Sequence, residues 1–177
     1  MYPKISKHTF FIFLIVFTFY LAYELYFLDK VYFLCPINYK DGGIAVRSDS
    51  YGSGDFMARR NGSRRHNGID LKADVGEPVY AVRGGRVLNA RFHRGMGNYV
   101  EIRHPGGYVT IYGHLSRIDT LQGVHVRQGD KIGEVGRTGN ANSPGLSPHL
   151  HLEIRLNGAP VDPMEFLLKQ EVENAGD

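Results

Sequence analysis

Two short histidine motifs hold the residues of this sequence that are best suited to chemistry. In "SPHLHLEIRL", residues 147–156, one leucine separates His149 from His151, and in "RRHNGIDL" His66 stands four residues before Asp70. Imidazole nitrogen and carboxylate oxygen are ligands of zinc, and a catalytic zinc site keeps three protein ligands and one open position. Chance would give about 0.8 histidine–acid pairs at this spacing and about 0.3 His-x-His motifs, so the conjunction of the two motifs matters more than either. His66, Asp70 and one histidine of the second motif are therefore candidate zinc ligands.

The alternation around His149 and His151 predicts a β-strand. In a helix a step of two residues turns the side chain by about 200°, whereas in a strand the two imidazoles lie on one face. Apolar and polar residues alternate over eight positions, which is typical of a half-buried strand. The apolar face, which packs on the core, carries Leu150, Leu152, Ile154 and Leu156. The other face presents both histidines and Glu153, which is either a hydrogen-bonding partner of a ligand or a solvated charge at the rim.

A third histidine stands in the run "YVTIYGHLS", residues 108–116. Tyr112 and His114 share one parity of this run, and Ile111 and Leu115 share the other. The run predicts a second strand with Tyr112 and His114 on its polar, groove-lining face. We expect Tyr112 either to pack in the protein or to support a neighbouring ligand through a hydrogen bond.

The composition fits one folded domain with an additional segment. The chain has 177 residues, of which 22% are charged and 12% are aromatic, and its formal net charge is +3. Lysine and arginine are scattered rather than gathered in a stripe, which argues against a nucleic-acid partner. The 22 glycines and the lack of tryptophan favour a β-rich domain with many turns. A single cysteine, Cys35, excludes an internal disulfide framework.

Short β-like runs separated by glycine turns follow one another from residue 68 onward. This punctuation predicts a mainly β fold, a small antiparallel sheet or sandwich that positions the histidines around a metal-binding groove. One short helix is expected near the C-terminus, with Asp162 as N-cap and Pro163 in its first turn. The expected strands cover residues 77–82, 85–92, 98–104, 108–115, 131–136 and 149–156.

An apolar segment at residues 9–28 predicts a transmembrane helix. It contains one charged residue, Glu24, and twenty helical residues span about 30 Å, the thickness of the hydrocarbon core of a bilayer. The alternative is a cleaved signal peptide, for which the segment lacks a good small-residue cleavage site. Lys4 and Lys7 precede the segment, so the positive-inside rule places the N-terminus in the cytoplasm and the domain outside. The lipid bilayer is therefore an expected partner.

These features divide the chain into five parts. We expect a cytoplasmic tail over residues 1–8, the membrane anchor over 9–28, a linker over 29–42, the folded domain over 43–168 and a tail over 169–177. The arginine-rich run "RRNGSRR" just before His66 is either a solvated loop or a surface that attracts anionic cell-wall polymer. The histidines without a partner pattern are expected to face solvent, and they are His8, His93, His104 and His125.

Beyond these motifs, the sequence closely resembles the LytM/lysostaphin-type zinc metalloendopeptidases, which cut peptide cross-links of bacterial peptidoglycan. The similar segments occur in the family's order and cover about residues 65–168. They are "HNGIDLKADVGEPVYAVRGGRV", "GNYVEIRHPGGYVTIYGHLS", "VRQGDKIGEVGRTG" and "SPHLHLEIRLNGAPVDPMEFL". The resemblance implies a small, mostly antiparallel β domain whose groove holds the metal.

The resemblance also implies roles for five residues. His66, Asp70 and His151 correspond to the ligands of one zinc ion per chain, and His114 and His149 correspond to catalytic histidines that do not bind the metal. The expected function is that of a membrane-anchored zinc endopeptidase, which hydrolyses peptidoglycan cross-links with a zinc-activated water in the periplasm or outside the cell. The alternative is a non-catalytic regulator of other cell-wall hydrolases, and the intact set of five residues favours the enzyme. The sequence predicts neither the bond that is cut nor any protein partner.

Overall fold

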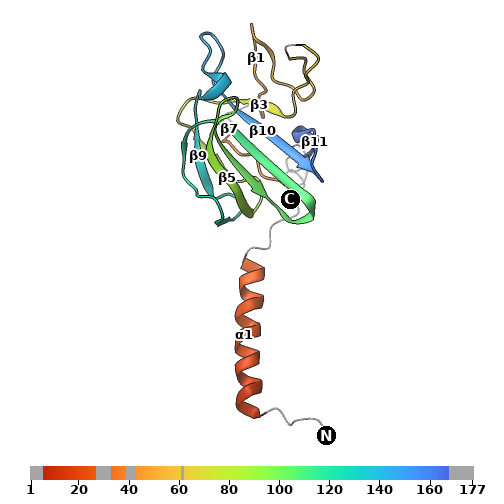
Figure 1. Cartoon of the computed structure of the whole chain (residues 1–177), viewed down its shortest axis with the longest axis vertical. Coiled ribbons are helices and arrows are strands. Elements are labelled where there is room, and N and C mark those ends of the chain that lie inside the picture. Colours follow the sequence, from red (N-terminus) through yellow and green to blue (C-terminus); the bar gives the residue numbers. More distant parts are fainter. Residues whose placement is uncertain (1–5, 27–32, 39–42, 61, 168–177) are drawn as a thin grey trace.

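The computed structural model describes residues 6–26, 33–38, 43–60 and 62–167 (Figure 1). A helix, α1 (Lys7–Tyr26), precedes a β domain that contains two short 3-10 helices, η1 (Pro105–Gly107) and η2 (Gly139–Ala141). The strands are β1 (Ser48–Asp49), β2 (Gly52–Ser53), β3 (Ile69–Lys72), β4 (Pro78–Tyr80), β5 (Gly85–His93), β6 (Gly97–Arg103), β7 (Tyr108–Ile118), β8 (His125–Val126), β9 (Lys131–Val135), β10 (His149–Leu156) and β11 (Ala159–Val161). Each of the six expected strands appears, within a few residues of its predicted bounds.

Nine of the described strands form one antiparallel sheet. The order along it is β11-β10-β7-β6-β5-β8, while β3 pairs with β10 and β9 pairs with both β7 and β4. A separate two-stranded sheet, β1 and β2, lies near the N-terminal end of β10 (Figure 1). The prediction of a mainly β, antiparallel domain is confirmed.

The core of the domain is apolar and is built from alternate residues of the central strands. Leu71 of β3, Ile102 of β6 and Leu152 of β10 are fully buried. Burial of each such side chain contributes about 1.5–3 kcal/mol. The core also takes in Phe33 and Ile37, which are 3% and 7% exposed, so these parts of the predicted 29–42 linker belong to the packed domain.

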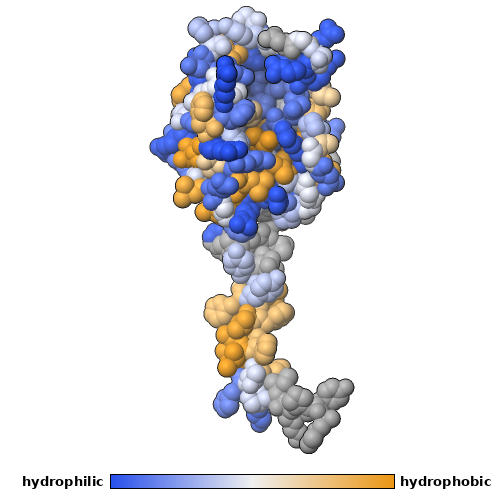
Figure 2. All heavy atoms as spheres, in the orientation of Figure 1, coloured by the Kyte–Doolittle hydropathy of each residue, from blue (hydrophilic) through white to orange (hydrophobic). Residues whose placement is uncertain are grey.

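Helix α1 carries apolar side chains that are exposed, as the orange surface in Figure 2 shows. Phe13 and Phe19, for example, are 68% and 73% exposed. Among the described residues, however, no helix is both long and apolar enough to cross a membrane. This finding does not support the transmembrane helix predicted for residues 9–28, of which residues 27 and 28 lie outside the described part of the chain.

The C-terminal helix begins where the sequence predicts. Residues 163–167 are helical, and the Asp162 carboxylate accepts a hydrogen bond from the backbone N–H of Met164 at 2.9 Å. This contact is that of a capping residue at a helix N-terminus. The predicted tail over residues 169–177 lies outside the described residues.

Candidate metal centre and active site

Strands β3 and β10 place a carboxylate and a histidine side by side. In their antiparallel register, His151 lies directly opposite Asp70. The next pair in the ladder, Leu150 with Leu71, points to the other face and is fully buried. A register slip by one residue would exchange the two faces, so the buried leucines fix which side chains face the site.

His66 reaches the same place from the loop before β3. Its backbone N–H donates to the Ala58 carbonyl at 3.0 Å, and its own carbonyl accepts from the Met57 N–H at 2.9 Å. Two residues later, a Cβ added to Gly68 would lie 2.2 Å from the backbone oxygen of Leu152. Only glycine therefore lets the loop pass this close to β10 and bring the histidine alongside it.

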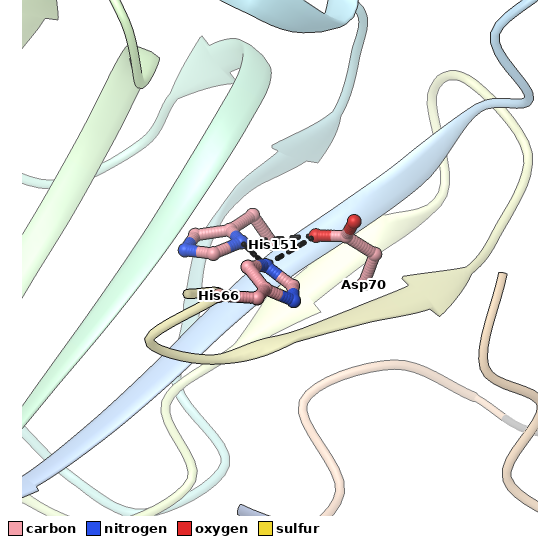
Figure 3. A group of neighbouring side chains, drawn as sticks. All are labelled: His66, Asp70 and His151. Carbon is pink, nitrogen blue, oxygen red and sulfur yellow. Dashed lines mark hydrogen bonds and ion pairs between the residues drawn. The ribbon is translucent and has the colours of Figure 1, made fainter. Parts of the chain in front are cut away.

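The side chains of His66, Asp70 and His151, hereafter the ligand cluster, converge on one point (Figure 3). His66 Nε2 lies 3.0 Å from His151 Nδ1, and Asp70 Oδ1 lies 2.9 Å from His151 Nδ1 and 3.2 Å from His66 Nε2. A tetrahedral zinc ion with bonds of about 2.0–2.1 Å holds its ligand atoms about 3.3 Å apart. The observed triangle matches that spacing to within a few tenths of an ångström.

The second nitrogen of each histidine in the ligand cluster is held by the protein. His66 Nδ1–H donates to the Asp55 carbonyl at 2.9 Å, and His151 Nε2–H donates to Glu153 Oε1 at 3.2 Å. Because these oxygens only accept, each ring in its neutral form turns a lone pair towards Asp70, where it can bind a cation. Three lone pairs that converge in this way call for a cation, and the donor set fits zinc. Glu153 is buried and supports a ligand, rather than lying at the rim as a solvated charge.

Two arginines hold the other oxygen of Asp70. Arg47 Nη2 and Arg60 Nη2 donate to Oδ2 at 2.9 and 3.1 Å, so that only Oδ1 is aimed at the ligand cluster. Burial alone would raise the pKa of Asp70, but its contacts with the imidazoles of His151 and His66 outweigh burial and hold the pKa well below its usual range. The side chain is therefore a carboxylate whenever the protein is folded near neutral pH.

His151 lies between two carboxylates. Burial alone would lower the pKa of His151, but hydrogen bonds to Asp70 and Glu153 outweigh burial and raise it to about 9. Glu153 is itself held by Arg155, whose Nη2 lies 2.6 Å from Oε2. The two carboxylates thus create a buried position that strongly favours a positive charge, whether a proton or a metal ion.

The two candidate catalytic histidines lie beside the ligand cluster, each with one nitrogen bound to a backbone carbonyl, and His149 Nε2 lies 3.9 Å from Asp70 Oδ1. His114 Nδ1–H donates to the Thr138 carbonyl at 2.9 Å, and His149 Nδ1–H donates to the Ser147 carbonyl at 2.7 Å. The two ring centroids are 5.1 Å apart. Burial, followed by the charges of neighbouring histidines, lowers the pKa of His114 to about 3, and burial also lowers the pKa of His149. Both rings are therefore neutral, with Nε2 available as an acceptor.

His114 reaches this position because the alternation of β7 breaks there. Tyr112 lies opposite Leu152 of β10 and faces the core, fully buried, so the predicted polar face of β7 was assigned to the wrong side. Regular alternation would send His114 into the core as well. Its backbone φ is instead +64°, in the left-handed region that non-glycine residues rarely adopt, and the ring turns to the groove. Strain of this kind costs on the order of 1–3 kcal/mol.

Of the two roles expected for Tyr112, the structure shows packing rather than support of a ligand, because its buried hydroxyl belongs to a different group. It accepts the Val82 N–H at 2.9 Å and lies 3.1 Å from Thr110 Oγ1, which is 2.7 Å from His104 Nε2. His104 Nδ1–H donates to the Gly84 carbonyl at 2.8 Å. We refer to His104, Thr110 and Tyr112 as the His104 network.

His104 was expected to face solvent, but it is only 4% exposed. Burial, together with the nearby charge of Arg83, lowers its pKa to about 4, although the hydrogen bond to the Gly84 carbonyl acts in the opposite direction. The ring packs edge-on against Phe33, one of the core residues before the predicted domain start. The other three histidines outside the site, at positions 8, 93 and 125, are exposed as expected.

The ligand cluster opens into a groove of about 1120 Å³. One part of its lining comes from segment 139–143, which has no charged residue, and another from the arginine-rich segment before His66. The arginines of the lining are Arg47, Arg59, Arg60, Arg64 and Arg65, whereas its carboxylates are Asp70 and Glu153. In Figure 2 the end of the domain remote from α1 is hollowed and its surroundings are hydrophilic.

Several residues that build the site gave no signal in the sequence. Arg47 binds a carboxylate 23 positions away, and such a contact leaves no local periodicity. Asp49 accepts from the Arg47 guanidinium and from the Ser147 N–H, and so ties the β1 region to the loop that precedes β10. The carbonyls that orient His66, His114 and His149 belong to the backbone and are independent of residue type.

Fold and site together define a β-sheet domain with a three-ligand metal site, and comparison with known proteins gives its family. The chain matches Peptidase family M23 over residues 64–163. This match covers more than half of the chain, which therefore belongs to this family, and the resemblance stated from the sequence is confirmed.

Similar proteins include enzymes whose names refer to cleavage of the bacterial cell wall. The chain is 45% identical over 105 residues to the DD-carboxypeptidase/endopeptidase Mpg of Neisseria meningitidis serogroup B, which covers 59% of this chain and 23% of that protein. It is 42% identical over 100 residues to the peptidoglycan DD-endopeptidase ShyA of Vibrio cholerae, covering 56% and 22%. Among solved structures, a zinc-containing peptidase from Vibrio cholerae matches with a TM-score of 0.61 and 33% identity, over 75% of this chain and 39% of that chain. The matched region is thus less than half the length of each relative.

Proposed function

We propose that the chain is a zinc endopeptidase that hydrolyses peptide cross-links in bacterial peptidoglycan, outside the cytoplasm. The observation that carries this proposal is the convergence of three possible ligand atoms on one point beside two neutral imidazoles in an open groove. The names of the peptidoglycan DD-endopeptidase from Vibrio cholerae and of the neisserial enzyme support the same substrate class.

His66 Nε2, Asp70 Oδ1 and His151 Nδ1 are the atoms that would hold the zinc. A zinc ion with three protein ligands supplies Lewis acidity and lowers the pKa of a bound water towards about 7. The surrounding residues keep these ligands in place: the Asp55 carbonyl and Glu153 fix the two rings. A structural zinc site would have four protein ligands, and the cluster of described residues that fits an ion has three.

His114 and His149 would carry the proton transfers. Hydrolysis adds water to the carbonyl carbon and breaks the C–N bond, so one group takes a proton from water and another gives a proton to the leaving amine. Each imidazole has its Nδ1–H tied to a backbone carbonyl, which leaves Nε2 to accept a proton or to hydrogen-bond the substrate. The ring of His114 lies 5.8 Å from that of His151, close enough for both to act on one bound peptide.

The experiment is digestion of purified, cross-linked peptidoglycan by the zinc-loaded full chain, with mass spectrometry of the released fragments. We expect cross-linked fragments to be replaced by their monomers, and the masses name the bond. The His114→Ala variant should bind zinc and release fragments at least about 100-fold more slowly. Tight zinc binding by wild type without any cleavage would contradict the proposal and favour a non-catalytic regulator of other hydrolases.

A further inference from the structure

The groove wall next to the ligand cluster is formed by two short chain segments rich in arginine. Residues 58–60 and 64–66, hereafter the arginine hairpin, run antiparallel: Arg59 and Arg65 form a bridge, and the Arg60 N–H donates to the Arg64 carbonyl at 3.1 Å. His66, the last residue of this hairpin, is itself in the ligand cluster. Whatever binds along this wall therefore lies directly beside the metal position.

The arginines of the hairpin divide into two kinds. Arg60 is partly buried and donates to Asp70 Oδ2, so its charge is used inside the site. Arg59 and Arg64 are exposed, line the groove, and have no ion pair or side-chain hydrogen bond within the described part of the chain. Arg65 is also exposed, and its one described side-chain contact is a long one, 3.5 Å, from Nη1 to the Met57 carbonyl.

The charge of the groove is therefore unbalanced and lies on one side. Its two carboxylates, Asp70 and Glu153, are already paired with Arg47, Arg60 and Arg155. Segment 139–143 offers amide and hydroxyl groups but no charge. A peptide in this groove would find neutral hydrogen-bonding groups along one part and unpaired guanidinium groups along the other.

We propose that Arg59, Arg64 and Arg65 form a subsite for a free carboxylate of the substrate peptide, within about two residues of the bond that is cut. This inference rests on the proposed function, to which the subsite adds a determinant of substrate specificity. Guanidinium groups bind carboxylates through paired, charge-assisted hydrogen bonds. An extended peptide advances about 3.3 Å per residue, so a carboxylate close in sequence to the reacting carbonyl would face the hairpin.

The test compares a synthetic cross-linked peptide dimer with versions in which one carboxylate at a time is converted into an amide. For the zinc-loaded full chain we would measure kcat/KM by mass spectrometry and Kd by fluorescence anisotropy of a labelled dimer. For one of the carboxylates, amidation should weaken binding and lower kcat/KM by about 10- to 100-fold in wild type. In Arg59→Gln or Arg64→Gln, the acid and amide forms should differ by less than about threefold.

A matched control is available outside the groove. Arg86 and Arg103 also lie opposite each other on neighbouring strands, β5 and β6, and do not line the groove. Arg86→Gln removes the same charge and should keep the full preference for the acid form. A loss of folding in the hairpin variants would lower activity on both substrates alike, whereas loss of the subsite lowers only activity on the acid.

The two readouts separate this inference from the proposed function. Absence of cleavage with a preserved binding preference for the acid would reject the endopeptidase and leave the subsite standing. Equal binding of acid and amide forms by wild type would reject the subsite, whether or not cleavage occurs. Inorganic polyphosphate serves as a further probe, and if the hairpin variants weaken its binding but leave the acid preference intact, the hairpin serves an anionic polymer and the proposal is overturned.

Discussion

The protein contains two buried histidine groups, and they are satisfied in opposite ways. In the His104 network, both ring nitrogens find a partner within the protein, the Gly84 carbonyl and the Thr110 hydroxyl. In the ligand cluster, one nitrogen of each ring is bound to the protein and the other faces further acceptors. The His104 network satisfies its hydrogen bonds within the protein, whereas the ligand cluster needs a cation between its facing donor atoms.

This difference shows what separates a structural histidine from a functional one. Burial is the same, since His104 and His151 are 4% and 6% exposed. Both pKa values are displaced, but in opposite directions, to about 4 for His104 and about 9 for His151. The neutral ring suits a hydrogen-bonded core, and the position that favours positive charge suits a metal. The partner of the second ring nitrogen therefore distinguishes a functional histidine from a structural one better than burial does.

The largest effect should come from removing a donor atom of the ligand cluster. The His151→Ala variant should lose at least about 1000-fold in zinc affinity and all cleavage of peptidoglycan. Zinc at 1000 times its Kd stabilises the wild type by about 4 kcal/mol, and this increment should vanish in the variant. Thermal unfolding with and without zinc measures it. His104→Gln is the matched change in the other histidine group and should keep the stabilisation by zinc. If this variant also loses it, the contrast between the two histidine groups is wrong.

The catalytic histidines should lose turnover while keeping the metal. His114→Ala and His149→Ala should each lower kcat by about 10²- to 10⁴-fold, because a proton-transfer group is removed. Their zinc affinity should stay within a few-fold of wild type, since neither ring contributes a ligand atom. Zinc titration beside a cleavage assay tests this pair of expectations. A variant that loses zinc as fully as His151→Ala would have to be counted among the ligands.

The His104 network should make stability depend on pH. The folded-state pKa of His104 is about 4, against 6.5 for the ordinary side chain, so the unfolded chain binds the additional proton between these values. The contribution is present above pH 6.5 and is lost as pH falls towards 4, by about 3 kcal/mol in the free energy of unfolding.

Denaturant unfolding of wild type and His104→Gln across this pH range isolates the effect, because all other titrating groups are common to both. The wild type should lose stability more steeply than the variant on acidification. Parallel curves would mean that His104 is not held neutral by the fold.

The smallest effect should come from the partner of a ligand. Glu153→Gln keeps the shape of the side chain but removes the charge that orients His151, and zinc affinity should fall by about 10- to 100-fold. Glu101→Gln is the matched control, because Glu101 lies on β6 and does not line the groove. If both variants bind zinc like wild type, the contact between Glu153 and His151 has no influence on the metal.

The sequence predicts the position of a site residue correctly where its strand keeps regular alternation. The leucines and histidines of β10 lie on the faces that their parity indicates, because the buried leucines fix the register. In β7 the same argument fails at His114, where a positive φ moves the ring to the opposite face from Tyr112. The local sequence gives no warning of this φ, because it is imposed by tertiary contacts such as the hydrogen bond from the His114 N–H to the Met96 carbonyl.

Long-range partners explain most of what sequence reasoning missed. Arg47 lies in a stretch without clear periodicity, yet it is 4% exposed and holds Asp70 from across the fold. Phe33 lies in the predicted linker and packs against Tyr108 and Phe166. His104 stands before a turn, which suggested exposure, but its partners come from two other parts of the chain. Such contacts depend on the whole fold and have no local pattern.

The most direct test of the central claim is zinc-edge X-ray absorption of the full-length protein after zinc loading and removal of excess metal. We predict one zinc per chain, a first shell of nitrogen and oxygen at about 2.0–2.1 Å, and the scattering signature of two imidazoles. The signal should persist in His104→Gln and disappear in His151→Ala. A shell with three imidazoles, or zinc retained without His151, would contradict the assignment of His66, Asp70 and His151 as the ligands.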